Sequence, residues 1–202
     1  MAGSYLDVNL VNHGFVRQPG GAFVTFDAPG ANSVPLAGTL VWGISATGAV
    51  TGYDIDTATV FQGFAGLPPK MMTLNIPCAV SSVFLGTRAL AINSANTLTG
   101  YYLDNSGVCH GFLLTKGGVL TTFEMGTQVT PSSIDMGGTV TGYYQDANGG
   151  VHRFLRATNG TITSFDVSGA NGTYPESIKG HGVAPGYYYD AEYAAHGFIL
   201  TP

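Results

Sequence analysis

The stretch TLTGYYLDNSGVCHGFLL, residues 97–114, decides the fold of this chain. Its apolar, aromatic and β-branched residues predict two short strands, separated by a polar turn that contains Asn, Ser and Gly. The motif returns as SYLDVNLVNHGF (4–15), VTGYDIDTATVFQGF (50–64), VTGYYQDANGGVHRF (140–154) and PGYYYDAEYAAHGF (185–198). In all five copies an aspartate stands six residues before a histidine or a glutamine. These pairs are Asp7 and His13, Asp56 and Gln62, Asp104 and His110, Asp146 and His152, and Asp190 and His196. A spacing kept five times in 202 residues predicts a repeat architecture.

Each repeat carries two further short strands. One follows the His-Gly-Phe element after a Gly- or Pro-containing turn and ends in an aromatic or aliphatic residue, in most copies followed by an acid. The other ends at an isoleucine eight residues before the glycine of the next Gly-Tyr pair. The isoleucines are Ile44, Ile92, Ile134 and Ile178. Four strands in about 45 residues, repeated in tandem, are typical of a β-propeller blade.

We therefore predict an all-β protein, a single propeller domain over residues 1–202, with repeats of about 3–51, 52–99, 100–141, 142–185 and 186–202. By analogy with WD-repeat blades, the strands that end in isoleucine (39–44, 87–92, 129–134 and 173–178) are innermost. The N-terminus then supplies second, third and outermost strands, and the C-terminus innermost, second and third. Five blades with both ends in one closing sheet are the first interpretation, because closure removes unpaired sheet edges. Four blades with a spare hairpin, a dimer that exchanges strands, and an open solenoid are the alternatives.

The pattern Ile-x-x-x-Gly-x-Val-Thr-Gly-Tyr followed by Gly-x-x-His-Gly-Phe closely resembles the bacterial extracellular HAF-type repeats, in which the tripeptide is usually His-Ala-Phe. The resemblance covers nearly the whole chain and implies a fold rather than an activity. His-Gly-Phe stands at 13–15, 110–112 and 196–198, and it is broken at 62–64 and 152–154.

The composition limits the kinds of partner and the location that we expect for this protein. Charged residues make up 9% of the chain and the seven Lys and Arg do not cluster, so nucleic acid is excluded as a partner. No apolar run approaches the roughly 18 residues of a membrane span. Low charge and many Gly and Tyr favour export, so we expect an extracellular or periplasmic protein whose leader is absent from this chain. Cys78 and Cys109 are expected close together, as free thiols rather than a disulfide.

The repeated aspartates and histidines allow three interpretations. Each pair could brace its own turn by a hydrogen bond, which an element present in every repeat favours. Imidazole and carboxylate are also ligands for a divalent metal, which makes His13, His110, His152 and His196 candidate ligands. The third is a sugar or other small ligand between blades, with tyrosine rings as flat surfaces and acids or amides as partners for hydroxyls. No GxSxG element and no phosphate-binding glycine loop is present.

The second repeat departs from the pattern and so marks the candidate site. It has Asp54 where the others have Tyr, which gives an acid pair with Asp56, and two carboxylates on one strand face raise each other's pKa or require a cation. Two long loops flank it and bring in Trp42 and Arg88. We predict a ligand pocket near the axis with these four residues and His110 as a neighbour.

Two functions follow. The first is a secreted propeller that binds a small ligand, in the main interpretation a glycan, on its loop-bearing face. The second is a metal-assisted hydrolase of ester or phosphoester bonds that uses Asp and His of the same face.

Overall fold

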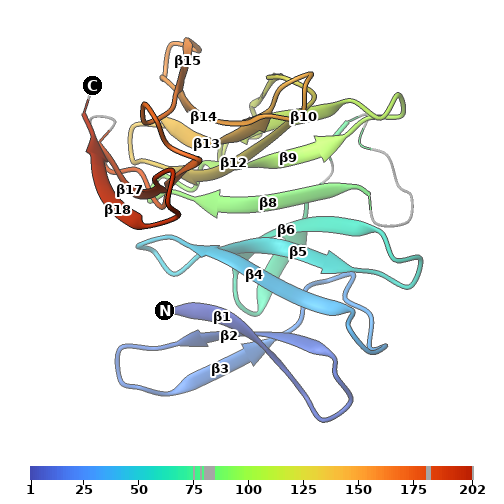
Figure 1. Ribbon diagram of the computed structural model, residues 1–202. Helices are drawn as coiled ribbons and strands as arrows, with labels where there is room; N and C mark the ends of the chain where they lie inside the picture. The colour runs from blue at the N-terminus through green and yellow to red at the C-terminus, as the bar shows by residue number, and fades with distance from the viewer. Residues whose placement is uncertain (75, 78, 80–84, 181–182, 202) are drawn as a thin grey trace.

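The protein is built almost entirely from short antiparallel strands. The computed structural model describes residues 1–74, 76–77, 79, 85–180 and 183–201. It contains eighteen strands, and no α-helix occurs among these residues, which confirms the all-β class. The sheets follow one another in chain order from the N-terminal to the C-terminal strands (Figure 1).

Three groups of four strands follow the predicted order from innermost to outermost, and we call each group a complete sheet. Two of them are separate sheets, and the first is part of a seven-stranded sheet that includes the N-terminal strands. The first comprises β4 (Gly38–Ile44), β5 (Val50–Ile55), β6 (Phe61–Leu67) and β7 (Lys70–Thr73). The second comprises β8 (Thr87–Ile92), β9 (Leu98–Leu103), β10 (Cys109–Leu114) and β11 (Leu120–Phe123). The third comprises β12 (Gln128–Ile134), β13 (Val140–Gln145), β14 (Val151–Arg156) and β15 (Ile162–Phe165).

The ends of the chain form two groups of three strands. At the N-terminus these are β1 (Ala2–Leu6), β2 (Asn12–Arg17) and β3 (Phe23–Phe26). At the C-terminus they are β16 (Gly172–Pro175), β17 (Ala184–Tyr189) and β18 (Ala195–Leu200). The N-terminal group joins the next sheet at one point, where Asn12 pairs with Gly38. The count of five second, five third, four innermost and four outermost strands is therefore confirmed.

Each complete sheet is held by the same buried unit. The phenylalanine of the third strand is fully buried in all three sheets, as Phe64, Phe112 and Phe154. A buried threonine of the second strand donates its hydroxyl to the carbonyl of that phenylalanine; Thr99, for example, lies 2.8 Å from the Phe112 oxygen. Burial of an aromatic ring beside a satisfied backbone carbonyl fixes the register of the two central strands.

A β-bulge recurs in the innermost strand of each complete sheet. The register shifts between Val41 and Gly43 in β4, between Ala89 and Ala91 in β8, and between Pro131 and Ser133 in β12. The glycine of the facing Gly-Tyr pair lies against the bulge, and a Cβ on Gly52 would collide with the carbonyl oxygen of Leu40. The repeated glycine is thus required by the close approach of the bulged backbone.

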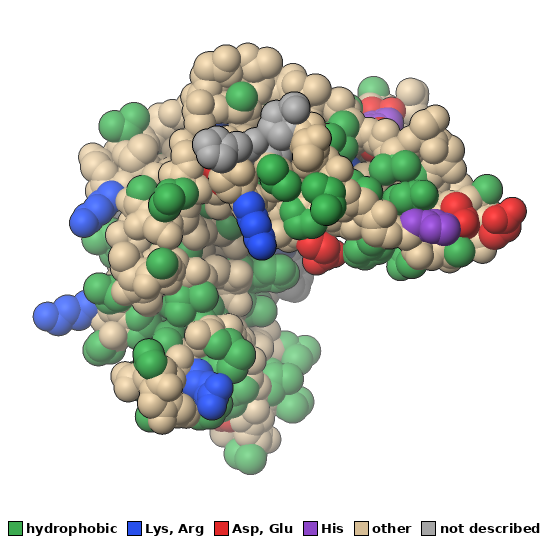
Figure 2. All heavy atoms as spheres, turned by 90° about the vertical axis from the view of Figure 1, so that its left-hand side faces the viewer, with side chains coloured by type: hydrophobic (Ala, Val, Ile, Leu, Met, Phe, Trp, Pro, Cys, Tyr) green, Lys and Arg blue, Asp and Glu red, His purple; other side chains and the backbone are tan. Residues whose placement is uncertain are grey.

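The predicted closing sheet is wrong. The strands β1–β3 and β16–β18 lie in separate sheets, and no strand pair joins them within the described ranges. The two ends stand apart in Figure 1, and Figure 2 shows a deep notch in the surface. Each end already holds its own second and third strands, so the two ends duplicate one another instead of completing one four-stranded sheet. The predicted ring of five blades is therefore not closed within the described residues.

At the C-terminal end β18 is poorly covered. Third strands of complete sheets are mostly buried, whereas β18 has only partly buried and exposed residues, and Ile199 is 71% exposed.

We expect backbone amides of β18 to exchange with deuterium faster than those of β10, because β18 lacks an outermost strand and buries little apolar surface. Hydrogen exchange followed by mass spectrometry on the whole chain measures this. Peptides from the N-terminal strand β2, which is covered by β3, serve as the internal comparison. Equal protection of β18 and β10 would show that the C-terminal sheet is closed in solution.

Candidate functional site

The recurring bulge gives three consecutive sheets an extra residue at the same place. These residues, which stand two positions before the repeated isoleucine, are Trp42, Leu90 and Ser132. A bulged residue leaves the hydrogen-bond ladder, and its side chain is re-aimed. All three line one cavity, so the bulges build a common surface along the inner strands.

The first cavity, which we call the Trp42–Arg88 cavity, has a volume of about 190 Å³. Besides the bulged residues it is lined by the tyrosines of three successive Gly-Tyr pairs and by two residues of inner strands. The lining residues are Trp42, Tyr53, Arg88, Leu90, Tyr101, Thr130, Ser132 and Tyr143. The Trp42 ring stacks on Tyr53 with centroids 6.2 Å apart, yet Trp42 stays 58% exposed. An exposed tryptophan held in place by a second ring is a ready surface for a ligand.

Arg88 lines the same cavity as this tryptophan and is surrounded by three aromatic rings. Its guanidinium carbon is 3.9 Å from the ring centroid of Phe61, 5.3 Å from that of Tyr53 and 5.6 Å from that of Tyr101. One guanidinium nitrogen, Nη1, donates to the Tyr101 hydroxyl at 2.6 Å. The rings fix the plane of the guanidinium through cation–π contacts.

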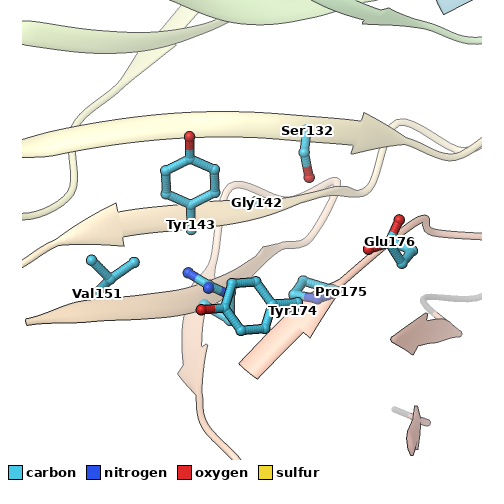
Figure 3. Close-up of a pocket in the computed structure, with 8 residues that line it drawn as sticks. Ser132, Gly142, Tyr143, Val151, Tyr174, Pro175 and Glu176 are labelled. Carbon is cyan, nitrogen blue, oxygen red and sulfur yellow. The ribbon is translucent and has the colours of Figure 1, made fainter. Parts of the chain in front are cut away.

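A second cavity, the Arg153 cavity, adjoins the first and shares Ser132 and Tyr143 with it. Its volume is about 380 Å³, and it lies between the third complete sheet and the C-terminal sheet. Figure 3 shows the rings of Tyr143 and Tyr174 near its middle, with Val151 at one end and Ser132 and Glu176 at the other. We call the two cavities together the bulge groove.

Arg153 has a different setting from Arg88. Its side chain is only 4% exposed, and the guanidinium carbon lies 4.6 Å from the Tyr174 ring centroid and 5.3 Å from that of Tyr143. Its Nε donates to the carbonyl of Thr173, and Nη1 donates to that of His152. Burial lowers the pKa of Arg153 from its ordinary value. Arg153 therefore ties the C-terminal sheet to its neighbour as well as lining the groove.

The structure brings together two of the five residues that the sequence pointed to. Trp42 and Arg88 line the same cavity. Asp54 lies on the other side of β5 from Tyr53, because neighbouring residues of a strand point to opposite faces. Asp56 lies in the turn between β5 and β6, and His110 lies near the start of β10; each has a local partner.

Each repeated histidine pairs with carboxylates beside the turn that precedes its strand, three of them with two carboxylates and His196 with one. The Nε2 atoms of His110, His152 and His196 lie 3.1, 3.3 and 2.7 Å from Asp104, Asp146 and Asp190, as predicted for the aspartate six residues earlier. For His13 that aspartate is 3.6 Å away, and the nearer partner is Asp27 at 2.7 Å.

A second acid, from the end of the outermost strand, was not foreseen. The Nδ1 atoms of His13, His110 and His152 lie 2.7, 3.0 and 2.7 Å from Asp27, Glu124 and Asp166. These acids are the main cause of the raised pKa of His13 and His152. No second acid pairs with His196 in the described part of the chain, because its sheet has no outermost strand there. Among the described residues no three His, Cys, Asp or Glu side chains gather as metal ligands. The four predicted ligands lie on four different strands, β2, β10, β14 and β18.

We expect His110→Ala to lower the free energy of unfolding by about 1–3 kcal/mol, since it leaves Asp104 and Glu124 without a partner. Chemical denaturation monitored by circular dichroism measures the loss. His110→Gln is the control, because the second repeat has a glutamine at this position. Gln62 donates from Nε2 to Asp56 at 3.0 Å, so His110→Gln should lower the free energy of unfolding clearly less than His110→Ala. A cost near zero for His110→Ala would mean that the imidazole is not a structural brace.

Asp54 is a buried carboxylate without a hydrogen-bond partner. The residue is 0% exposed, and neither carboxylate oxygen has a hydrogen-bond partner among the residues that the structure describes. It replaces the tyrosine that stacks on the turn histidine in other repeats, as Tyr102 does on His110. Burial, with a smaller contribution from the charge of Asp56, raises the pKa of Asp54 to about 7. A Cβ on Gly30 would come within 2.8 Å of an Asp54 oxygen, so the loop from the first repeat closes over this carboxyl.

The raised pKa predicts a pH dependence of stability. Between about pH 4 and pH 7 the folded protein binds the Asp54 proton more tightly than the unfolded chain, so stability falls as pH rises through this window. Asp54→Asn removes this loss of stability. At pH 8 we expect its free energy of unfolding to exceed that of the parent protein by on the order of 2 kcal/mol. Denaturation curves at pH 4.5, 6 and 8 measure the effect, with the exposed Glu192→Gln as control. An identical pH profile in Asp54→Asn would disprove the assignment.

Cys109 is a buried free thiol whose sulfur contacts the carbonyl of Val129 at 3.4 Å. Burial raises the pKa of this thiol, which makes it a poor nucleophile. Cys78 lies outside the described residues, so the predicted proximity of the two cysteines stays a prediction.

Several groove residues were not predicted as site residues from the sequence, among them Arg153, Tyr174 and Glu176. A signal for them exists. The position two residues before the repeated isoleucine holds Trp42, Leu90, Ser132 and Glu176 in turn, so an otherwise regular strand varies where it meets the groove. Arg153 breaks the His-Gly-Phe tripeptide.

No helix in the described part of the chain is long and apolar enough to span a membrane. No protein-family model matches the chain, and no curated protein is similar to it, so the resemblance to HAF-type repeats rests on the motifs alone. Several solved structures are similar to most of it, including the following two. A mutant of AofleA from Arthrobotrys oligospora is 15% identical with a TM-score of 0.49, and the match covers 98% of this chain and 67% of that one. The fucose-recognising, six-bladed β-propeller lectin of Aleuria aurantia is 12% identical with a TM-score of 0.45, covering 98% and 69%. Both similarities are distant, so the ligand of this chain has to be inferred from its own side chains.

Proposed function

We propose that this protein is a glycan-binding propeller module whose site is the bulge groove. The observation that carries the proposal is Trp42, a 58% exposed tryptophan that stacks on Tyr53 at a cavity lined by Arg88. A sugar presents an apolar C–H face together with hydroxyl groups. Such a ligand fits a site that combines flat rings with a few fixed polar groups.

The groove supplies both kinds of contact along its length. Tyr143 and Tyr174 are 43% and 37% exposed and continue the row of aromatic surfaces beyond Trp42. Thr130, Ser132 and Glu176 offer hydroxyl and carboxylate groups beside them. Two adjoining cavities of about 190 and 380 Å³ suit an oligosaccharide better than a single sugar ring. We retain export to the extracellular space or periplasm and homodimer formation as predictions.

Trp42 is the only tryptophan of the chain, so its fluorescence reports on the site directly. We expect a saturable change in its emission when the protein is titrated with a panel of neutral and acidic oligosaccharides. Tyr143→Ala should lower the affinity for the oligosaccharide at least about tenfold, because Tyr143 lines both cavities. Calorimetry with Trp42→Ala, which lacks the reporter, should show a similar loss.

Phe23→Ala is the matched control, since Phe23 is a 60% exposed aromatic residue of β3 that lines neither cavity of the groove. It should bind like the parent protein. The proposal fails if no oligosaccharide of the panel changes the emission, or if Phe23→Ala weakens binding as much as Tyr143→Ala does.

A further inference from the structure

Arg88 carries a positive charge that nothing in its cavity balances. In the described structure every carboxylate that contacts a basic side chain contacts a histidine, and none lies within ion-pair distance of Arg88. The other seven residues that line the Trp42–Arg88 cavity are uncharged. The charge therefore stands alone in a partly closed, largely aromatic space, where electrostatic interactions are stronger than in bulk water.

The geometry of Arg88 leaves hydrogen-bonding capacity for a ligand. A guanidinium has five N–H donors, and only Nη1 has an acceptor in the described structure, the Tyr101 hydroxyl at 2.6 Å. No nitrogen of Arg88 is among the buried atoms that lack a partner, so the remaining N–H groups are open to solvent. The guanidinium carbon lies 3.9 Å from the Phe61 ring centroid, so this ring packs against a face of the guanidinium. Edge-on, paired N–H groups are the arrangement that binds a carboxylate.

The neighbouring Arg153 cavity shows the contrast. Arg153 has acceptors in two backbone carbonyls, and Glu176 lines the same cavity. That end of the groove thus holds one positive and one negative side chain, whereas the Trp42–Arg88 end holds a positive one alone. The chain as a whole has a net charge of −5, so the positive charge of this cavity is opposite in sign to that of the protein.

We infer that the Trp42–Arg88 cavity binds an acidic sugar, a uronic-acid unit whose ring stacks on Trp42 and whose carboxylate pairs with Arg88. This inference rests on the proposed glycan-binding function and names the class of glycan. The rest of the oligosaccharide continues into the Arg153 cavity, where one positive and one negative side chain together with hydroxyl groups suit neutral units.

The test compares acidic oligosaccharides with their uncharged counterparts. The probes are oligomers of galacturonate, glucuronate and mannuronate, each beside its methyl ester, and the readout is Trp42 emission. We expect at least one uronate oligomer to bind at least about tenfold more tightly than its ester, and less tightly in 0.5 M salt than in 0.05 M salt.

Variants assign this preference to the guanidinium. Arg88→Gln should abolish the difference between acid and ester. Arg88→Lys should keep part of it, because an ammonium group retains the charge but not the paired N–H donors. Arg17→Gln, at an exposed arginine outside both cavities, should leave it unchanged. Thermal denaturation verifies that each variant is folded. If Arg88→Gln does not fold, the comparison of acid and ester is made with Arg88→Lys instead.

The outcomes separate the two proposals. If esters or neutral oligosaccharides bind as tightly as uronates, or if a folded Arg88 variant keeps the full preference, the acidic-sugar inference is overturned while glycan binding stands. If neither acids nor esters change the Trp42 emission and calorimetry detects no heat, both proposals are overturned.

Discussion

The structure depends on one backbone constraint, the bulge that meets a glycine in every complete sheet. The bulged innermost strand brings a carbonyl oxygen so close to Gly52, and to its equivalents in the next sheets, that no Cβ fits there. The same bulge releases Trp42, Leu90 and Ser132 from the ladder. A feature that fixes strand register thus also lines the groove, because a residue outside the ladder is free to point where the paired residues cannot.

The repeat also separates structural from ligand-binding residues. The repeated aspartates and histidines are the most regular feature of the sequence, and they stabilise turns. His110, for example, lies between Asp104 and Glu124. The variable positions of the inner strands face the groove instead. Such a division is physically reasonable, since each sheet needs the same brace while a ligand needs an asymmetric set of contacts.

The two breaks in the tripeptide have different consequences. At Gln62 the amide takes over the bond to Asp56, and Asp54 occupies the place of a stacking tyrosine, which leaves a buried carboxyl whose protonation stabilises the fold. At Arg153 a long cation replaces glycine and reaches Tyr174 in the following sheet. One break affects stability within a sheet, and the other helps to form a cavity between sheets.

Sequence alone determined the eighteen strands and the pairing of most of the repeated histidines with the aspartate six residues earlier, because these follow from local periodicity and fixed spacing. The order of the strands within each sheet came from the analogy with WD-repeat blades. The sequence also pointed to Trp42 and Arg88 as site residues. Only the tertiary structure decided that the ring is not closed within the described residues, that Asp54 is enclosed by the loop at Gly30, and that Arg153, Tyr174 and Glu176 share a cavity. These features depend on how one sheet packs on the next, and contacts between sheets join residues too far apart in the chain for any local pattern to encode.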